Sequence, residues 1–233
     1  MAQLFITPYE RQGNSIIITN SEVIEQCKKV LRLEVWKEIS LQNTIWDNTT
    51  RHTISITEIK QHIKGTIIDE KIVSKDWSKR SMSIAMPNKR DKIELIVQKL
   101  AEIWIDQINF WPSERSIIKE WNTKKAERFL KIAKEATEQS RNRFIPEIWF
   151  SKTPIVSDDT EYIIFDKQDN AENTFKIQNP SSKICWIIGP EGWLTNKDYT
   201  LRAEAPHHIQ QLGNGVLRTE TWAIIGWRLI KNN

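Results

Sequence analysis

Two glycine-containing segments near the C-terminal end of the chain have residue types suited to binding a ligand. The first reads "IIGPEGWLTNKD" from Ile187 to Asp198, and the second reads "QLGNGVLRTET" up to Thr221. Each follows an apolar run and precedes a predicted helix. Glycine lets backbone amides and carbonyls approach a ligand closely, and open parallel sheets bind ligands beyond the carboxyl ends of their strands. The spacing leaves two interpretations open, a shared ligand site or two ordinary turns.

Other common site motifs are missing from the sequence. It contains no G-x-G-x-x-G and no G-x-x-x-x-G-K-[ST], so dinucleotide and P-loop sites find no support. The cysteines, Cys27 and Cys185, lie far apart, and no pair of cysteines or histidines has metal-ligand spacing. We therefore expect no metal site, and two reduced, buried thiols.

Length and charge set broad limits on the protein. The chain has 233 residues, a net charge of +4 and a sequence pI near 9.0. This mild basic excess fits an anionic partner such as nucleic acid, and fits an ordinary protein equally well. No apolar run approaches the ~20 residues of a membrane span, and the N-terminus is unlike a signal peptide. We expect a cytoplasmic protein without a membrane partner.

The first third of the sequence has the pattern of a small β-barrel. Short apolar or alternating stretches predict strands at 15–19, 37–45, 52–59 and 64–73. One helix is predicted between them, from Ser21, its expected cap, to Leu31. Several short strands with one helix suggest a barrel domain covering residues 1–72.

The remainder, residues 73–233, alternates strands with helices. Strands are predicted at 82–87, 107–111, 162–166, 184–190 and 207–213. Helices are predicted at 91–103, 123–139, after Thr195 and at 219–230, with Asp91 and Glu94 spaced as a capping box and Asp198 paired with Thr195. This alternation predicts an α/β domain, a parallel sheet covered by helices on both faces.

The paired glycine segments resemble a known family. Enzymes of the RsmE family of ribosomal RNA methyltransferases carry a GPEGG loop and, near the C-terminus, an LG-x-x-[IV]-LR-x-ET segment. The sequence has "GPEGW" and "LGNGVLRTET" in that order. Further similar segments are "VLRL", "KRDKIELIVQKLAEI", "SERSI" and "KIAKEATEQS". The resemblance covers nearly the whole chain.

The resemblance implies a fold and an activity. The second domain would be a SPOUT α/β domain whose C-terminal segment threads into a trefoil knot. The first would be a PUA-like or OB-like β-barrel that helps to hold RNA. A homodimer would transfer the methyl group of S-adenosyl-L-methionine to N3 of a uridine in small-subunit ribosomal RNA. Two alternatives stay open: ribose 2′-O methylation by another SPOUT enzyme, and a catalytically inactive RNA-binding relative.

The resemblance also implies site residues. The implied cofactor-binding residues are Ile188, Gly189, Pro190, Glu191, Gly192, Trp193, Leu212, Gly213, Val216, Leu217 and Thr219. Uracil N3 is weakly acidic, so methylation requires loss of its proton or stabilisation of the resulting anion. Arg218 could stabilise that anion, with a phosphate or helix-cap contact as the alternative. Glu220 could accept the proton or hold Arg218 in place. Alternatively, its charge could only offset the partial positive charge at a helix N-terminus. Glu191 has the same alternatives.

Basic residues in the same motifs are candidates for RNA phosphate contacts. They are Arg32, Lys89, Arg90, Arg115, Arg141 and Arg143. A solvated basic face is the alternative for each of them. The family arginine expected after the serine of "EQS" falls on Asn142 here, between two arginines, which leaves their alignment open.

The tryptophan content is unusual. The chain has 11 Trp and 7 Gly, 18 together, or about 8% of 233 residues, whereas Gly alone is usually about 7%. Trp36, Trp46, Trp104 and Trp193 all lie where the family tends to have glycine. Our hypothesis is that the source organism reads UGA as glycine. The alternative is that Trp193 is genuine and stacks on the adenine of the cofactor.

Overall fold

The structure is a computed structural model, and it describes residues 2–43, 49–74, 80–120, 123–154, 160–165, 183–200, 207–210 and 217–231. Its contacts divide the chain into two compact units. The first unit comprises Met1–Lys75 and Thr137–Ile145, and the second comprises Asp76–Ala136 and Pro146–Asn233. No helix in the described ranges is long and apolar enough to cross a membrane.

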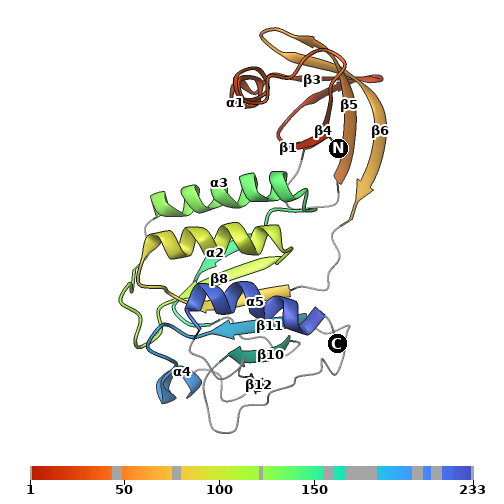
Figure 1. Ribbon diagram of the computed structural model, residues 1–233. Helices are drawn as coiled ribbons and strands as arrows, with labels where there is room; N and C mark the ends of the chain where they lie inside the picture. Colours follow the sequence, from red (N-terminus) through yellow and green to blue (C-terminus); the bar gives the residue numbers. More distant parts are fainter. Residues whose placement is uncertain are drawn as a thin grey trace. The chain divides into compact units, whose positions relative to one another are not determined.

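The first unit is built on a six-stranded sheet of order β1-β4-β5-β6-β3-β2 (Figure 1). Its strands are β1 (Gln3–Ile6), β2 (Glu10–Gln12), β3 (Ser15–Ile18), β4 (Glu38–Gln42), β5 (Thr49–Ile59) and β6 (Ile63–Val73). Only the β1–β4 pair is parallel, and two register shifts interrupt the β5–β6 ladder. Such irregularities bend and twist strands, as a barrel-like sheet requires. The β-rich domain expected from the sequence is confirmed, with β1 and β2 as strands the sequence did not reveal.

The helix of the first unit differs in detail from its prediction. α1 (Ser21–Glu25) continues directly into a π-helix, η1 (Gln26–Val30). Asn20, not Ser21, is the N-cap, and its Oδ1 accepts a hydrogen bond from the Val23 amide at 3.1 Å. Neighbouring Asn and Ser residues are equally good caps, so the sequence could not decide between them. The buried side chains of this helix, including Cys27, join the core of the sheet.

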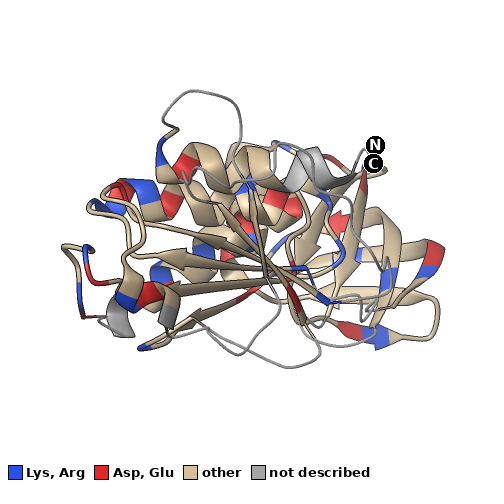
Figure 2. Ribbon diagram, turned by 90° about the horizontal axis from the view of Figure 1, so that it is seen from below, with Lys and Arg blue, Asp and Glu red and all other residues tan. Residues whose placement is uncertain are grey.

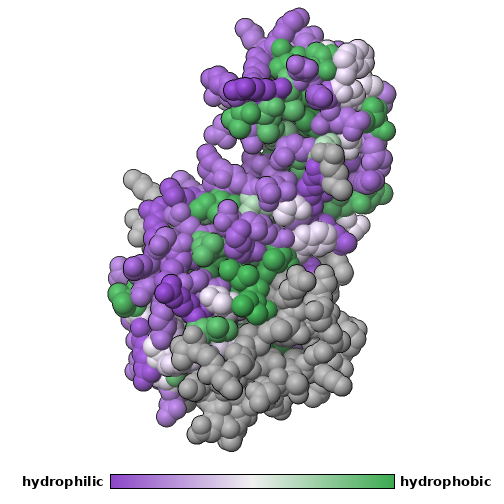
Figure 3. Space-filling model, in the orientation of Figure 1, coloured by the Kyte–Doolittle hydropathy of each residue, from purple (hydrophilic) through white to green (hydrophobic). Residues whose placement is uncertain are grey.

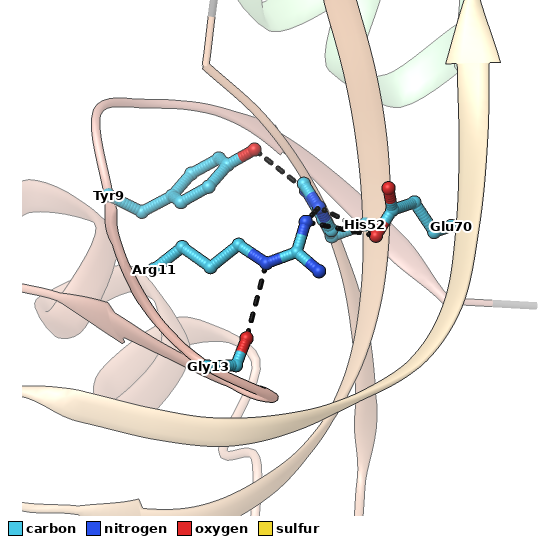
Figure 4. A network of polar contacts seen from close by, with 5 residues as sticks. All are labelled: Tyr9, Arg11, Gly13, His52 and Glu70. Atoms are coloured by element: carbon cyan, nitrogen blue, oxygen red, sulfur yellow. Dashed lines mark hydrogen bonds and ion pairs between the residues drawn. The ribbon is translucent and has the colours of Figure 1, made fainter.

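A polar network closes one side of this sheet (Figure 4). His52 is buried, its Nδ1 lies 2.8 Å from Tyr9 Oη, and its Nε2 lies 3.2 Å from Arg11 Nη1 and 3.3 Å from Glu70 Oε2. Arg11 in turn pairs with Glu70 at 3.1 Å. Burial lowers the pKa of His52 despite the neighbouring Glu70 carboxylate. A neutral ring that donates from Nδ1 to Tyr9 Oη and accepts at Nε2 from Arg11 fits the first two contacts, and Arg11 then bridges the ring to the Glu70 carboxylate.

The second unit contains a parallel sheet of order β12-β10-β11-β7-β8-β9. Its strands are β7 (Arg80–Ala85), β8 (Gln107–Trp111), β9 (Glu147–Phe150), β10 (Thr160–Phe165), β11 (Lys183–Ile188) and β12 (His207–Gln210). β10 and β11 are apolar along most of their length and are buried, as strands covered on both faces must be. The predicted parallel α/β sheet is confirmed. β9 was not among the predicted strands.

Four helices of this unit are described, α2 (Arg90–Glu102), α3 (Thr123–Ser140), α4 (Asn196–Thr200) and α5 (Thr219–Lys231). The predicted capping box at Asp91 and Glu94 is wrong. Lys89 is the N-cap of α2 and makes no side-chain cap bond, since an ammonium group cannot accept one. Glu94 binds Arg90 and Arg128. The predicted Thr195–Asp198 box is correct, with Thr195 N to Asp198 Oδ2 at 2.9 Å and Asp198 N to Thr195 Oγ1 at 3.3 Å. Parts of the segment in which the knot is predicted, residues 201–206 and 211–216, lie outside the described residues.

Candidate active site

The two glycine-containing segments meet at the carboxyl end of the parallel sheet. β11 ends at Ile188 and is followed by the turn at 189–193, while α5 begins at Thr219. The hydroxyl of Thr219 donates a hydrogen bond to the Gly189 carbonyl at 3.3 Å, across 30 positions of sequence. Thr219 is 2% exposed, so this bond is shielded from water. The first strand end and the first turn of the last helix therefore form one site.

A small cavity lies between these segments. Its volume is about 20 Å³, enough for about one water molecule. The lining residues are Phe165, Ile188, Gly189, Pro190, Glu191, Trp193, Leu217, Thr219 and Trp222. Apolar side chains with a few polar backbone groups are the lining typical of small-molecule sites. Trp193 is the largest side chain that the turn contributes to this wall.

Lys92 joins both segments through their carboxylates. Its Nζ lies 2.7 Å from Glu191 Oε1, in the turn, and 3.6 Å from Glu220 Oε2, in the first turn of α5. Lys92 comes from the first turn of α2 and its side chain is only 17% exposed. Glu220 Oε2 is buried and makes no hydrogen bond with the described residues. Two carboxylates and one ammonium group leave a net negative charge beside the cavity.

The electrostatics of the Lys92–Glu191 pair favour its ionised form. The hydrogen bond to Glu191 raises the pKa of Lys92 above its ordinary value. Burial raises the pKa of Glu191, but the hydrogen bond from Lys92 and backbone hydrogen bonds from Glu191 itself and from Asn88 outweigh burial and lower it overall. At neutral pH Lys92 is therefore cationic and Glu191 anionic.

The segment between β8 and α3 fastens the turn from another side. Arg115 Nη1 donates to the Gly192 carbonyl. The backbone amide of Glu114 donates to Asp198 Oδ1 at 3.0 Å, and Asp198 is 2% exposed. Asp198 thus caps α4 and anchors the neighbouring loop with its two oxygens. The sequence predicted the cap alone, because nothing in the spacing shows that the two segments are neighbours.

The cofactor-binding residues predicted from the sequence divide into two groups. Seven of them line the cavity: Ile188, Gly189, Pro190, Glu191, Trp193, Leu217 and Thr219. Gly192 lies in the same turn and accepts from Arg115. Leu212, Gly213 and Val216 lie outside the described residues.

The two predicted catalytic residues differ in their surroundings. Arg218 is exposed, immediately before α5, and is not among the residues that line the cavity. Glu220 points to Lys92, which is the cation that the structure places beside its carboxylate. Lys92 was not singled out from the sequence. Its position after Asp91 at a helix start gave no indication of partners 99 and 128 residues away.

The candidate RNA contacts are distributed over both units. Lys89, Arg90 and Arg115 belong to the second unit, where Arg90 pairs with Glu94 at 3.0 Å and Arg115 holds the turn. Arg32, Arg141 and Arg143 belong to the first. Figure 2 shows basic and acidic residues interspersed along the ribbon. Arg90 and Arg115 therefore already have partners within the protein, a third possibility beside the phosphate contact and the solvated basic face expected from the sequence.

Comparison with known proteins places the chain in a family. The family model "RNA methyltransferase domain" matches residues 74–231, more than half of the chain. The chain belongs to this RNA methyltransferase family. The match contains every residue of the site described above, from Lys92 to Trp222. The resemblance drawn from the glycine-containing motifs is confirmed.

Relatives of the family match over nearly the whole chain. The chain is 26% identical to the ribosomal RNA small subunit methyltransferase E 2 of Borreliella burgdorferi, covering 95% of this chain and 93% of that protein. It is 25% identical to the ribosomal RNA small subunit methyltransferase E of Rickettsia conorii, covering 95% and 91%.

Solved structures share the fold. The methyltransferase E structure from Neisseria gonorrhoeae, bound to S-adenosyl methionine, has a TM-score of 0.79 at 22% identity and covers 97% of this chain and 95% of that chain. The structure of the methyltransferase Lpg2936 from Legionella pneumophila, also with this cofactor, has a TM-score of 0.79 at 24% identity and covers 100% and 98%. The chain therefore has the fold of these methyltransferases, an α/β domain with a parallel sheet preceded by a β-rich domain.

Proposed function

We propose that this protein transfers the methyl group of S-adenosyl-L-methionine to N3 of a uridine in small-subunit ribosomal RNA. The observation that carries the proposal is the meeting of the two motif segments, joined by the Thr219–Gly189 hydrogen bond, around one cavity. Membership of the RNA methyltransferase family supports methyl transfer as the reaction and RNA as the substrate. Relatives named for the small ribosomal subunit, and related structures bound to S-adenosyl methionine, support the choice of substrate and cofactor.

The lining of the cavity suits the chemical nature of this cofactor. Ile188 and Leu217 offer apolar surface for the adenine ring, and the turn at 189–193 offers backbone groups for the polar parts. S-adenosyl-L-methionine supplies an electrophilic methyl group on a positively charged sulfonium. The net negative charge of Glu191, Glu220 and Lys92 favours a cation at the cavity.

The reaction needs one proton removed and one anion stabilised. The N3–H bond of uracil loses its proton, the N3 electron pair forms the new bond to the methyl carbon, and the carbon–sulfur bond breaks with its electrons left on a neutral thioether. Arg218, exposed beside the cavity, is proposed to stabilise the anionic uracil with its planar guanidinium. Glu220 is proposed to receive the proton, because Oε2 makes no hydrogen bond with the described residues.

Lys92 is proposed to hold the site in shape. By pairing with both carboxylates it keeps the turn at 189–193 and the start of α5 at a fixed separation. Its hydrogen bond also lowers the pKa of Glu191.

The proposal includes a homodimer that works in the cytoplasm, where ribosomes are assembled. Leu95 of α2 and Ile225 of α5 are 39% and 40% exposed. Figure 3 shows apolar atoms at the surface of the second unit where Figure 1 draws these helices. Exposed apolar surface of this kind is typical of subunit contacts and supports self-association.

The test is to identify the modified nucleoside. Small-subunit ribosomal RNA that lacks base methylation, both naked and assembled into subunits, is incubated with the protein and labelled S-adenosyl-L-methionine. Nucleoside digestion and mass spectrometry should find 3-methyluridine at one position. A labelled 2′-O-methyl nucleoside would contradict the proposal in favour of ribose methylation, and an absence of labelling from both substrates would favour the inactive RNA-binding relative.

A further inference from the structure

Three tryptophans of this chain have a backbone conformation that large side chains rarely adopt. Trp36, Trp104 and Trp193 have φ values of 73°, 71° and 66°. In the described part of the chain, the other non-glycine residues with positive φ are Arg32 and Arg141. Trp makes up 11 of 233 residues but three of these five. At positive φ the Cβ atom crowds the neighbouring carbonyl oxygen, so a bulky residue there is an outlier.

Trp104 terminates α2 where a glycine is normally found. The amide of Ile105 donates to the Leu100 carbonyl at 3.1 Å, and the amide of Trp104 donates to the Ala101 carbonyl at 3.4 Å. These two bonds define a Schellman motif, with Trp104 as the left-handed residue after the cap. α3 ends in the same way at Arg141, so the fold imposes this conformation whatever the side chain.

Trp36 likewise occupies a left-handed position, here in a β-turn. The Lys37 amide donates to the Glu34 carbonyl at 3.2 Å, which makes Trp36 the third residue of the turn. With positive φ at that residue and not at Val35, the turn is of the kind that requires glycine there. The side chain of Trp36 is 78% exposed, so burial of the indole does little to offset the strain.

Trp193 completes the turn that forms the active-site wall. Its amide donates to the Pro190 carbonyl at 3.0 Å, so it is the fourth residue of that turn, another position that favours glycine. Three separate places in the fold thus combine a tryptophan with a backbone conformation that favours glycine.

We propose that residues 36, 104 and 193 are glycines in the natural protein, because its gene is read with UGA as a glycine codon. The combined count of 18 Gly and Trp residues, close to the usual content of Gly alone, agrees with this proposal. Trp111 and Trp186 differ: they are fully buried in β8 and β11 and are not among the residues with positive φ, so they remain tryptophans. Trp46 lies outside the described residues.

The assignment changes the active-site cavity. A glycine at 193 removes the largest side chain that the turn places in a wall enclosing only about 20 Å³. The cavity then widens while the backbone of the turn, the Lys92 ion pairs and the Thr219 bond are kept. This consequence for cofactor binding rests on the proposed function, whereas the identity of the residues does not.

Codons and mass test the residue identities directly. The gene should carry UGA at positions 36, 104 and 193 and UGG at 111 and 186. Peptide mass mapping of the protein purified from its natural host should find glycine at positions 36, 104 and 193. UGG at 36, 104 or 193, or a tryptic peptide that contains tryptophan at one of them, would overturn the proposal there.

A stability series tests the structural argument in the recombinant chain. Each of Trp36, Trp104 and Trp193 is replaced by Gly and, separately, by Ala, and the urea midpoints are compared. At positive φ Gly should be the more stable of the two, because Ala keeps the crowded Cβ. Trp222, buried within α5, is the matched control, and there Ala should be more stable than Gly. Ala more stable than Gly at the three positive-φ sites would contradict the proposal.

Calorimetry with S-adenosyl-L-methionine separates this proposal from the proposed function. Trp193→Gly should bind the cofactor at least tenfold more tightly than the chain with tryptophan. Equal binding by Trp193→Gly and the parent chain would show that Trp193 is compatible with the site and would overturn the cavity argument. If Gly is preferred over Ala at 193 but neither chain binds the cofactor, the residue assignment stands and the proposed function fails.

Discussion

The hydroxyl of Thr219 and the carbonyl of Gly189 form a hydrogen bond that closes the active-site cavity between a strand end and a helix start. Replacing Thr219 with Val keeps the shape and removes the donor. The loss of one buried hydrogen bond is about 1 kcal/mol, or roughly a fivefold loss of cofactor affinity. Thr219→Ser, which keeps the hydroxyl, is the matched control. Equal cofactor Kd for Thr219→Val and the parent would show that this bond does not shape the site.

Lys92 is predicted to be a positioning residue. In Lys92→Met the pKa of Glu191 should rise, because the hydrogen bond and positive charge that lower it are gone. Activity should fall at neutral pH and fall further toward acidic pH, as Glu191 takes up a proton. The pH profile of kcat/KM from pH 5.5 to 8.5 measures this change.

Two variants control for the loss of a lysine. Lys92→Arg should retain much of the activity and the parent pH profile. Lys99→Met removes the pairing of a second α2 lysine with Glu102, away from the cavity, and should leave activity unchanged. A Lys92→Met enzyme with the pH profile of the parent would contradict the role of Lys92.

Arg218 is predicted to act in catalysis and not in folding. Its side chain is exposed, so Arg218→Ala should change the free energy of unfolding, measured by urea denaturation, by no more than about 0.5 kcal/mol. Turnover should fall on the order of a hundredfold or more, as when a transition-state donor is removed. Arg128→Ala, another exposed arginine of the same unit, should keep full turnover. Unchanged turnover in Arg218→Ala would remove Arg218 from the mechanism.

His52 gives the first unit a pH-dependent stability. Its pKa is lowered in the folded state, so the unfolded chain binds its proton first as the pH falls. The contribution of neutral His52 is complete above its ordinary pKa near 6.5 and is lost between that value and the lower folded pKa. Urea midpoints from pH 8 to 5 should fall less steeply in His52→Gln than in the parent. His62→Gln, at a more exposed histidine, is the control. Parallel pH curves for parent and His52→Gln would contradict this assignment.

Local patterns sufficed to predict much of the fold. The apolar run at 184–190 predicted β11, because a strand buried on both faces is apolar throughout. The alternation at 52–59 predicted β5, because a strand buried on one face alternates apolar and polar residues. The short strands β1 and β9 were not predicted, since four residues carry too little periodicity to distinguish a strand from a loop. The Asp91–Glu94 box failed because Arg128, 34 residues further along, takes the Glu94 carboxylate.

The site was predictable only where a motif was contiguous. The turn at 189–193 and the start of α5 are each local, so their residues could be named, but their contact depends on the topology of the sheet. Lys92 and Asp198 act across 80 or more positions, and no spacing rule reveals such partners. The positive φ at Trp193, by contrast, could be expected from its place in a tight turn.

The most direct test of the account is amide hydrogen exchange with and without S-adenosyl-L-methionine, measured on the parent chain and on Trp193→Gly. The account predicts that the cofactor slows exchange at 189–193 and at 217–221 together in Trp193→Gly, with a weaker effect in the parent. Protection confined to one of these segments, or found only elsewhere in the chain, would contradict a methyl-donor site formed jointly by the two.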